Sequence, residues 1–492
     1  MSRLAFALVA LALALPVAAQ GSAGFVINDP LAARQWYLSS IHAFDYWSVP
    51  PGELAPVRVA VIDSGIDLDH PEFAGRVALA QSFVGGDVTD RQGHGTFVAG
   101  IIGAALDNGL GIAGIAFPAD LLIAKVVRSD GTIAPAEEAK AIRWAADNGA
   151  QVINLSLGGL RDPQDASQNS YSRLEQSAIS YAYSKGAVVV AAVGNADDAP
   201  KTPWHYASYP AALPHVIGVS ALAQDGSVPA FSIRDKIYND LAAPGVGIVS
   251  TLPRSLTAAH PSCVEQGYSI CGPPEFRPAD GTSYAAAQVT AAAALLIAAR
   301  PTLSPDQVTA LLERSATDVS AATGCLRCQL GRDWYSGWGE LNVAAALKAL
   351  TGPIPPRDQY EGNDEAGDLA FALYGSSIDV KATIDYWDDN IDVYKVRLLR
   401  GQTVSVSLRG PAGTDTNLVL WRPGTKRVDS PLIGQQAALQ AWRVTQSARA
   451  GPKEHMLYRA RETGWYYVEV KVTTQGSGQY RLHIAKSPAI AR

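Results

Sequence analysis

The stretch Val57–Asp63, VRVAVID, is the part of the chain that decides the fold. Its apolar and largely β-branched residues are typical of a strand buried on both faces of a parallel sheet. Four later runs repeat the pattern, at residues 121–127, 152–157, 188–193 and 216–220. Helix-like segments separate them, such as Pro135–Asn148, where Glu137 and Glu138 favour the N-terminal end. This alternation predicts an α/β fold with a doubly wound parallel sheet flanked by helices.

The composition changes at residues 351–357, TGPIPPR, a proline-rich stretch that predicts a linker. Beyond it, apolar and polar residues alternate, and glycines separate the runs. The alternating apolar positions are Val404, Val406 and Leu408, then Val468, Val470 and Val472, then Tyr480, Leu482 and Ile484. We therefore expect an α/β domain over residues 20–350 and a smaller antiparallel β-sandwich over residues 358–492.

The first residues, MSRLAFALVALALALPVAAQ, have the features of an export signal. Arg3 gives a positive start, residues 4–15 are apolar, and small residues from Val17 to Ala19 precede a cleavage site. The apolar run is shorter than the ~20 residues of a spanning helix. We expect residues 1–19 to be removed and the protein to be secreted, into the medium or a periplasm. No later stretch is expected to be long and apolar enough to span a membrane without Gly, Pro or charges.

Composition and charge exclude some classes of protein. The chain of 492 residues is 48% apolar and 17% charged, which favours well-buried globular domains over disorder. Its formal net charge of -6, without a long basic run, argues against a nucleic-acid partner. A monomer is the default expectation.

Four cysteines in an exported chain can form disulfides. Four cysteines allow three connectivities, and local pairing of Cys263 with Cys271 and of Cys325 with Cys328 is preferred. The CxxC at 325–328 could also be a redox centre or half of a zinc site. The sequence nearby has no second CxxC and no HxxxH, so a structural disulfide is favoured.

Three segments place a reactive side chain at the end of a strand or the beginning of a helix. Asp63 ends the buried strand. In GHGTFVAG, His94 opens a run of small and apolar residues that can form a helix, and Ser283 in DGTSYAAAQVTAAAALL precedes an alanine-rich run with high helix propensity. A serine hydroxyl becomes a nucleophile when a base takes its proton, and histidine can do so near neutral pH. A buried carboxylate fixes the tautomer of that histidine. Asn195, which follows a strand, is the candidate amide donor for the oxyanion.

The chain resembles the subtilisin-like serine proteases (subtilases), in which the triad also follows the order Asp, His, Ser. The resemblance rests on VAVIDSG, HGTFVAG, NLSLGG, VGN and GTS, in that order between residues 59 and 283, and covers about residues 25–350. The stretch NDPLAARQWYL at 28–38 is most similar to the thermitase branch. The resemblance implies a serine endopeptidase that acts on polypeptides through an acyl-enzyme. Asp63 would orient the imidazole of His94, and His94 would be the general base. Ser283 would be the nucleophile and Asn195 the hydrogen-bond donor to the oxyanion.

The resemblance also implies where a substrate binds. It assigns an edge strand that pairs with the substrate backbone, two walls of the first specificity pocket, and its base. These residues are Ser156, Leu157 and Gly158 for the strand, Ala192, Val193 and Gly194 for the walls, and Ser208 for the base. Small uncharged residues imply broad specificity with a preference for a large apolar side chain before the scissile bond. Here Ala287 and Gln288 stand where many relatives have Pro and His.

A calcium site is carried over from the same resemblance. Its ligands would be the carboxylates of Asp29 and Glu72, the amide of Asn108 and the carbonyls of Ala105, Leu110 and Ile112. Oxygen donors of this kind suit calcium. Surface acids without a metal are the alternative interpretation of Asp29 and Glu72.

The tail resembles the bacterial pre-peptidase C-terminal domain. The motifs are YEGND at 360–364, DNIDVYKV at 389–396, Gly401-Gln402, GWYYV at 464–468 and GQY at 478–480. The resemblance implies a β-sandwich that assists secretion, is removed during maturation or contacts substrate. Two other functions stay open: a binding protein that has kept a protease fold, and a binding module in which the tail dominates.

Overall fold

The computed structural model describes residues 26–48, 54–259, 275–355, 357, 359–360, 362–428 and 439–488. The predicted signal peptide, residues 1–19, lies outside these residues. The predicted pair Cys263 and Cys271 lies outside them as well.

Seven parallel strands form the central sheet, in the order β2-β3-β1-β4-β5-β6-β7. They are β1 (Val57–Asp63), β2 (Val77–Ser82), β3 (Ala119–Lys125), β4 (Val152–Leu155), β5 (Val188–Ala192), β6 (Val216–Leu222) and β7 (Leu241–Pro244). The chain moves to one side after β1 and to the other after β4, so the direction of winding reverses between these two strands. Ligands of such sheets bind at the carboxyl ends of the strands at this reversal. Asp63 and the residues after Leu155 therefore lie where a ligand is expected.

Helices cover both faces of the sheet, which confirms the predicted fold class. One face packs against α2 (His94–Gly103) and α6 (Thr282–Ala299), and the other against α3 (Pro135–Asp147) and α4 (Arg173–Ser184). Smaller elements complete the domain: α1 (Trp36–Ser40), α5 (Arg254–Ala259), α7 (Pro305–Ser315), α8 (Val343–Ala349) and the hairpin of β8 (Ile248–Thr251) and β9 (Phe276–Ala279).

Helix α6 is long and apolar enough to cross a membrane, as judged by its length and composition. The expectation that no stretch after the leader meets these criteria is therefore wrong. However, 89% of this 18-residue helix is buried inside the protein. It packs against β4, β5, β6 and α2, so in this fold it is the core helix of the α/β domain.

The C-terminal part forms two packed sheets, as predicted. One has the order β10-β12-β17-β14-β15 and the other β11-β18-β13-β16. The strands are β10 (Phe371–Leu373), β11 (Ser377–Asp385), β12 (Ile391–Leu398), β13 (Thr403–Arg409), β14 (Thr416–Trp421), β15 (Arg443–Ser447), β16 (Lys453–Arg459), β17 (Gly464–Val472) and β18 (Ser477–Lys486). The strands pair antiparallel, as predicted, except at one edge, where β10 and β12 are parallel. The reason is that β11, which joins them, returns in the opposite sheet.

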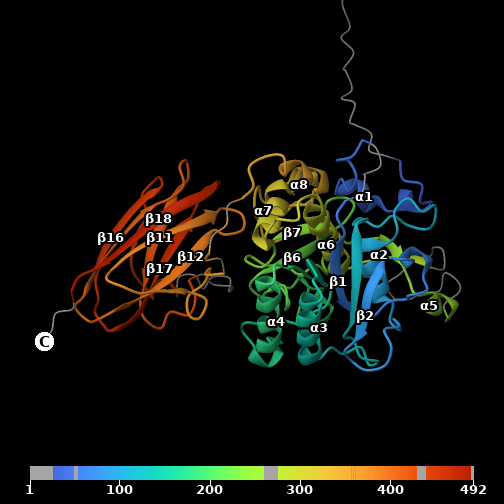
Figure 1. Ribbon diagram of the computed structural model, residues 1–492, viewed down its shortest axis with the longest axis horizontal. Helices are drawn as coiled ribbons and strands as arrows, with labels where there is room; N and C mark the ends of the chain where they lie inside the picture. The colour runs from blue at the N-terminus through green and yellow to red at the C-terminus, as the bar shows by residue number, and fades with distance from the viewer. Residues whose placement is uncertain are drawn as a thin grey trace, which may run out of the picture.

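The sandwich lies beside α7 and α4 of the α/β domain (Figure 1). Arg314 of α7 forms an ion pair with Asp385 and places its guanidinium 4.7 Å from the centre of the Trp387 ring. On the other side of the contact, Arg427 donates to the Tyr238 hydroxyl over 2.8 Å. Charged and aromatic groups therefore join the two domains.

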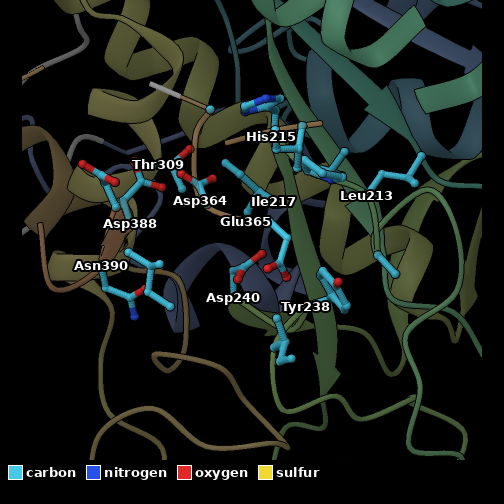
Figure 2. A pocket seen from close by; sticks show the side chains of 18 of the residues that line it. Leu213, His215, Ile217, Tyr238, Asp240, Thr309, Asp364, Glu365, Asp388 and Asn390 are labelled. Atoms are coloured by element: carbon cyan, nitrogen blue, oxygen red, sulfur yellow. The ribbon is translucent and has the colours of Figure 1, made fainter. Parts of the chain in front are cut away.

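A cavity of about 680 Å³ remains between the domains. Figure 2 shows Asp240 and Tyr238 of the α/β domain and Glu365 of the tail around this space. Burial raises the pKa of the nearby Asp364 carboxyl to about 7, and the charges of Asp306 and Glu365 add to the shift. Acidic and basic side chains line the cavity in nearly equal numbers, and none of the predicted catalytic residues is among them.

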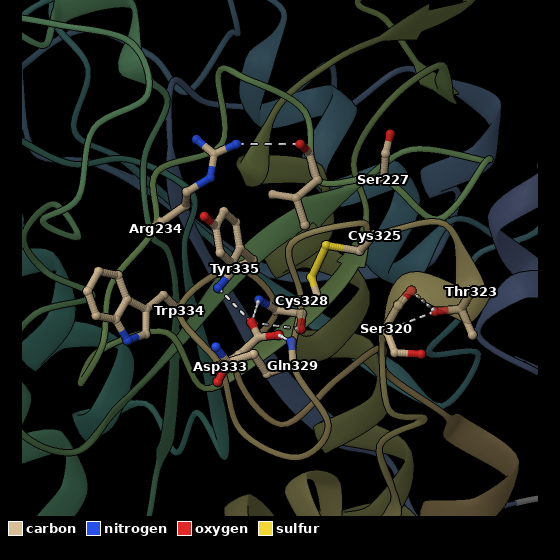
Figure 3. Close-up of a disulfide and its surroundings, with 12 residues drawn as sticks. Ser227, Arg234, Ser320, Thr323, Cys325, Cys328, Gln329, Asp333, Trp334 and Tyr335 are labelled. Carbon is tan, nitrogen blue, oxygen red and sulfur yellow. Dashed lines mark hydrogen bonds between the residues drawn. A yellow bond between two sulfur atoms is a disulfide. The ribbon is translucent and has the colours of Figure 1, made fainter.

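Cys325 and Cys328 are joined by a disulfide, as the sequence analysis favoured (Figure 3). The turn that follows is held by Asp333, whose carboxylate accepts from the backbone N–H groups of Gln329 and Tyr335 over 2.8 and 2.7 Å. The disulfide therefore belongs to a closed loop that packs against β6 and β7 through Leu222 and Ala242.

Close packing of α2 against β8 generates a stability prediction. A Cβ at Gly100 would lie 2.5 Å from Ser250 Oγ and closer still to Thr251 Oγ1, and both hydroxyls already donate to α2 carbonyls. We expect Gly100→Val to lower the free energy of unfolding by about 3 kcal/mol through overpacking. Denaturant unfolding would measure the change. Gly352→Val is the control, because a Cβ there would lie 3.4 Å from its nearest neighbour, the Ala349 carbonyl oxygen. Equal losses for both variants would contradict the prediction.

Candidate active site

The structure brings the predicted aspartate and histidine into direct contact. Asp63 at the end of β1 is 2% exposed, and both of its carboxylate oxygens lie 2.9 Å from Nδ1 of His94. The backbone N–H of Ser64 also donates to Asp63 Oδ1 over 2.7 Å, which fixes the carboxylate. The His94 side chain stays 33% exposed. A histidine bonded through Nδ1 to a buried carboxylate presents its other ring nitrogen for proton transfer.

Ser283 is the second residue of α6, at the end of the helix where backbone N–H groups have no partner in the helix. Its hydroxyl donates to the carbonyl oxygen of Ser156 over 3.1 Å, and the Ser156 hydroxyl donates to the Ser283 carbonyl over 2.8 Å. These two bonds connect the nucleophile candidate to the segment after β4. The Ser283 hydroxyl therefore points to the predicted edge strand in this structure.

Asn195 is held by the residue before the candidate nucleophile. Its side-chain oxygen accepts from the backbone N–H and the hydroxyl of Thr282, over 3.1 and 3.0 Å. Because the oxygen is used in this way, the amide nitrogen is the end that faces away from the helix. A nitrogen donor beside the N-terminus of α6 can stabilise negative charge on a carbonyl oxygen.

A second buried carboxylate lies behind the histidine. Asp90 is fully buried and accepts five hydrogen bonds, from the Ser64 hydroxyl, three backbone N–H groups and the Thr96 hydroxyl, over 2.8–3.0 Å. The Ser64 hydroxyl accepts in turn from the Gly95 N–H over 2.9 Å. Asp90 thus fixes both the beginning of α2 and the residue after Asp63. Asp90 was not among the predicted site residues, although an acidic residue just before a helix is a known signal.

Burial of His94 favours its neutral form, but the charge of Asp63, its hydrogen bond and the charge of Asp90 outweigh that effect. Together they raise the pKa of the imidazole above its usual 6.5. The Tyr284 ring lies 5.8 Å from the His94 ring and 4.4 Å from the Phe97 ring, between centres. Tyr284 thus fills the space beside the candidate base.

The predicted specificity pocket is assembled from two segments that touch. The Ser208 N–H donates to the Val193 carbonyl over 2.8 Å, so the predicted base joins the predicted wall. Gly194 has φ +102, and a Cβ there would press against the Ser208 side chain. Ala192 and Val193 are buried. Glycine is therefore favoured at this wall for two reasons: the backbone has a positive φ, and there is no room for a Cβ.

The structure also brings the predicted calcium ligands together. Asp29 accepts from the N–H groups of residues 107–109 over 2.8–3.2 Å. Glu72, fully buried, accepts from the Ile112 N–H over 2.8 Å and from the Asn108 amide over 3.2 Å. Burial raises the pKa of Glu72 to about 7, and the nearby charge of Asp29 adds to the shift. Two buried carboxylates and an amide enclosed by one loop fit an oxygen-liganded cation.

Among the described residues, no three His, Cys, Asp or Glu side chains gather as metal ligands. A cation in this loop would therefore depend on the Asn108 amide and on backbone carbonyls in addition to its two carboxylates. The carbonyls predicted for this purpose belong to Ala105, Leu110 and Ile112.

The profile of the Subtilase family matches residues 55–331. The chain belongs to the subtilase family. It is 35% identical to thermitase of Thermoactinomyces vulgaris over 324 residues, which are 65% of this chain and 99% of thermitase. It is also 35% identical to subtilisin DY of Bacillus licheniformis, over 60% of this chain and 92% of subtilisin DY. Among solved structures it is similar to a protease of Pseudoalteromonas arctica, with a TM-score of 0.52, 26% identity, and coverage of 66% of this chain and 99% of that one.

Membership of this family makes the protein a serine-type endopeptidase with polypeptide substrates. The matched residues include the Asp63, His94, Asn195 and Ser283 contacts described above. They end before the β-sandwich, so the resemblance of the tail to a pre-peptidase domain stays a prediction. The domain boundaries at 19, 350 and 357 stay predictions as well.

The surroundings of His94 generate a second prediction. Because Asp63 and Asp90 raise its pKa, the His94 imidazole should titrate above pH 6.5 in an NMR titration of the folded protein. Asp90→Asn removes one negative charge and should lower the midpoint, while Asp87→Asn, an exposed change in the same loop, should leave it in place. A midpoint below 6.5 in the unaltered protein would contradict this account.

Proposed function

We propose that Asp63, His94 and Ser283 are the catalytic triad of this endopeptidase, with Asn195 as the oxyanion donor. The contact that carries the proposal is the hydrogen bond from His94 Nδ1 to the buried Asp63 carboxylate. It leaves Nε2 of His94 to take the proton of Ser283 when the serine attacks a peptide carbonyl. The serine must first turn from the Ser156 carbonyl, and a substrate backbone that pairs with this segment would release it.

In this mechanism, the attack on the carbonyl creates an oxyanion at the N-terminus of α6. The Ser283 N–H and the Asn195 amide donate to it, and Thr282 keeps the amide in its orientation. His94, now protonated and stabilised by Asp63, gives its proton to the leaving amine. Water then attacks the carbonyl of the acyl-enzyme in the same way, with His94 again as the base.

The proposed substrate runs along Ser156, Leu157 and Gly158, which follow β4. Gly158 lies close to the backbone of Tyr209, and a Cβ there would press against the Tyr209 carbonyl. The side chain before the scissile bond would enter the pocket of Ala192, Val193, Gly194 and Ser208. Because these residues are small and uncharged, an apolar residue is preferred there.

Export of the enzyme is proposed from the N-terminal sequence, with removal of residues 1–19. The disulfide between Cys325 and Cys328 supports an oxidising destination, either extracellular or periplasmic.

We propose calcium as a structural ion of the loop 105–112. Asp29, Glu72 and Asn108 would hold it with the carbonyls of that loop, and the ion would compensate the two buried carboxylates. Its contribution is to stability, since it lies outside the contacts of His94 and Ser283.

Replacement of the nucleophile tests the triad. Ser283→Ala should lower kcat for an apolar chromogenic peptide by about 10⁶-fold, the loss that removal of the serine causes in subtilisin, a relative. Ser39→Ala, an exposed serine, is the control and should keep full activity. Circular dichroism would check that both variants are folded. A Ser283→Ala protein that retains a tenth of the activity would refute the assignment.

Calcium binding is tested through thermal unfolding. Calcium at about 100 times its Kd should stabilise the protein by about 2.7 kcal/mol, and chelation should remove this gain and lower Tm. Asp29→Asn should abolish the response to calcium, whereas the exposed Asp69→Asn should retain it. If chelation leaves Tm unchanged, the calcium proposal fails, and the triad is unaffected by that result.

A further inference from the structure

A small cavity lies beside the segment that follows β4. It has a volume of about 90 Å³ and is lined by Leu157, Gly158 and Gly159 of that segment, by Tyr209, and by residues of α3 and α4. Ligand sites for whole small molecules have about 300–1,000 Å³. The cavity therefore has room for the end of one side chain.

Two glutamates from different helices line this cavity, Glu138 of α3 and Glu175 of α4. They are 5% and 4% exposed, and neither forms an ion pair with any residue that the structure describes. Oε1 of Glu138 is buried without a hydrogen-bond partner among those residues. Buried carboxylates normally have a cationic partner or a full set of donors. This pair has no cationic partner among the described residues.

The two carboxyl groups lie close enough for each to affect the pKa of the other, which favours a proton on one of them. Burial raises the pKa of both, and the charge of Glu175 raises that of Glu138 further. When no substrate side chain occupies the cavity, a proton on one of the two carboxyl groups therefore reduces their negative charge, as a cation would. A guanidinium can take its place, because its fork of N–H donors matches two carboxylates.

The position of the cavity relative to the nucleophile indicates which substrate residue reaches it. The Ser283 hydroxyl lies 3.1 Å from the Ser156 carbonyl, so the attacked bond lies at that end of the segment. Gly159 is three residues further on, or about 10 Å at the ~3.3 Å per residue of an extended chain. Ser208, the proposed base of the first pocket, is directly followed by Tyr209, so the two pockets adjoin on the same side of the attacked bond.

We propose that Glu138 and Glu175 form an acidic subsite that selects a basic side chain, arginine above all, at the fourth substrate residue before the scissile bond. This inference rests on the proposed function, because it takes the substrate direction from Ser283 and the edge segment. It adds a charge requirement to a peptidase whose first pocket is uncharged. The preferred substrates are proteins with a basic residue three positions before the apolar residue at the cleavage site.

The glycines of the segment keep this subsite open. A Cβ at Gly159 would press against the Ser170 side chain, whose backbone N–H and hydroxyl both donate to the Leu160 carbonyl. The wall at this point is therefore backbone, which cannot neutralise the glutamates. Glu137, the neighbour of Glu138, points elsewhere and bonds Arg128 over 3.1 Å.

Three peptides that differ only at the fourth residue before the cut test the inference. The residue is arginine, citrulline, which has nearly the same shape without the charge, or leucine. We expect kcat/KM for the arginine peptide to exceed that for the citrulline peptide by about tenfold or more, the size of a hydrogen bond to a charged group. Arginine moved one residue closer to the cut should lose this advantage.

Isosteric variants then assign the effect to the glutamates. Glu138→Gln and Glu175→Gln should each bring the arginine-to-citrulline ratio close to one, mainly because the arginine peptide is cleaved more slowly. Glu137→Gln is the matched control, with the same loss of charge on the same helix, and should keep the full ratio. A ratio of one or less in the unaltered enzyme, with the leucine peptide cleaved, overturns the subsite alone. Failure to cleave all three peptides contradicts the proposed function on which it rests.

Discussion

The burial of α6 against the central sheet is the constraint on which the rest of the structure depends. The helix consists largely of alanine with a few larger apolar residues, so it can approach β4, β5 and β6 closely. That approach places its N-terminus at the carboxyl ends of the strands. Ser283 then meets the segment after β4, and Thr282 meets Asn195 after β5. Larger side chains on α6 would hold the helix further from the sheet and so move these groups apart.

Three groups of buried carboxylates in the domain differ in how their charge is compensated. Asp90 is satisfied fully by donors from its own surroundings, so it can remain charged inside the protein. Asp29 and Glu72 accept several donors but still lie close to each other, a situation that a cation relieves. Glu138 and Glu175 depend on one shared proton. The number of hydrogen-bond donors around each group therefore differs with its role. Asp90 positions its neighbours, Asp29 and Glu72 form the proposed metal site, and Glu138 and Glu175 form the proposed subsite.

The β-sandwich is joined to the peptidase domain by charged and aromatic contacts such as Arg314 with Asp385 and Trp387. A cavity lined by both acidic and basic side chains separates the two surfaces elsewhere. Interfaces of this polar kind are typical of domains that keep their own cores. The two domains have separate hydrophobic clusters, which agrees with that interpretation.

The sequence by itself determined five of the seven strands of the sheet, the alternation with helices and the reactive residues at element ends, because these signals are local; β2 and β7 were not predicted. Asp63 ends a buried strand, His94 opens a helix and Ser283 begins another, and each can be recognised within about ten residues. It also indicated the period-two pattern of the tail, but not the parallel pairing of β10 with β12. Only the tertiary structure decided which distant groups meet. Glu138 was expected merely to favour a helix start, and its meeting with Glu175 depends on how α3 packs on α4, which no local pattern specifies.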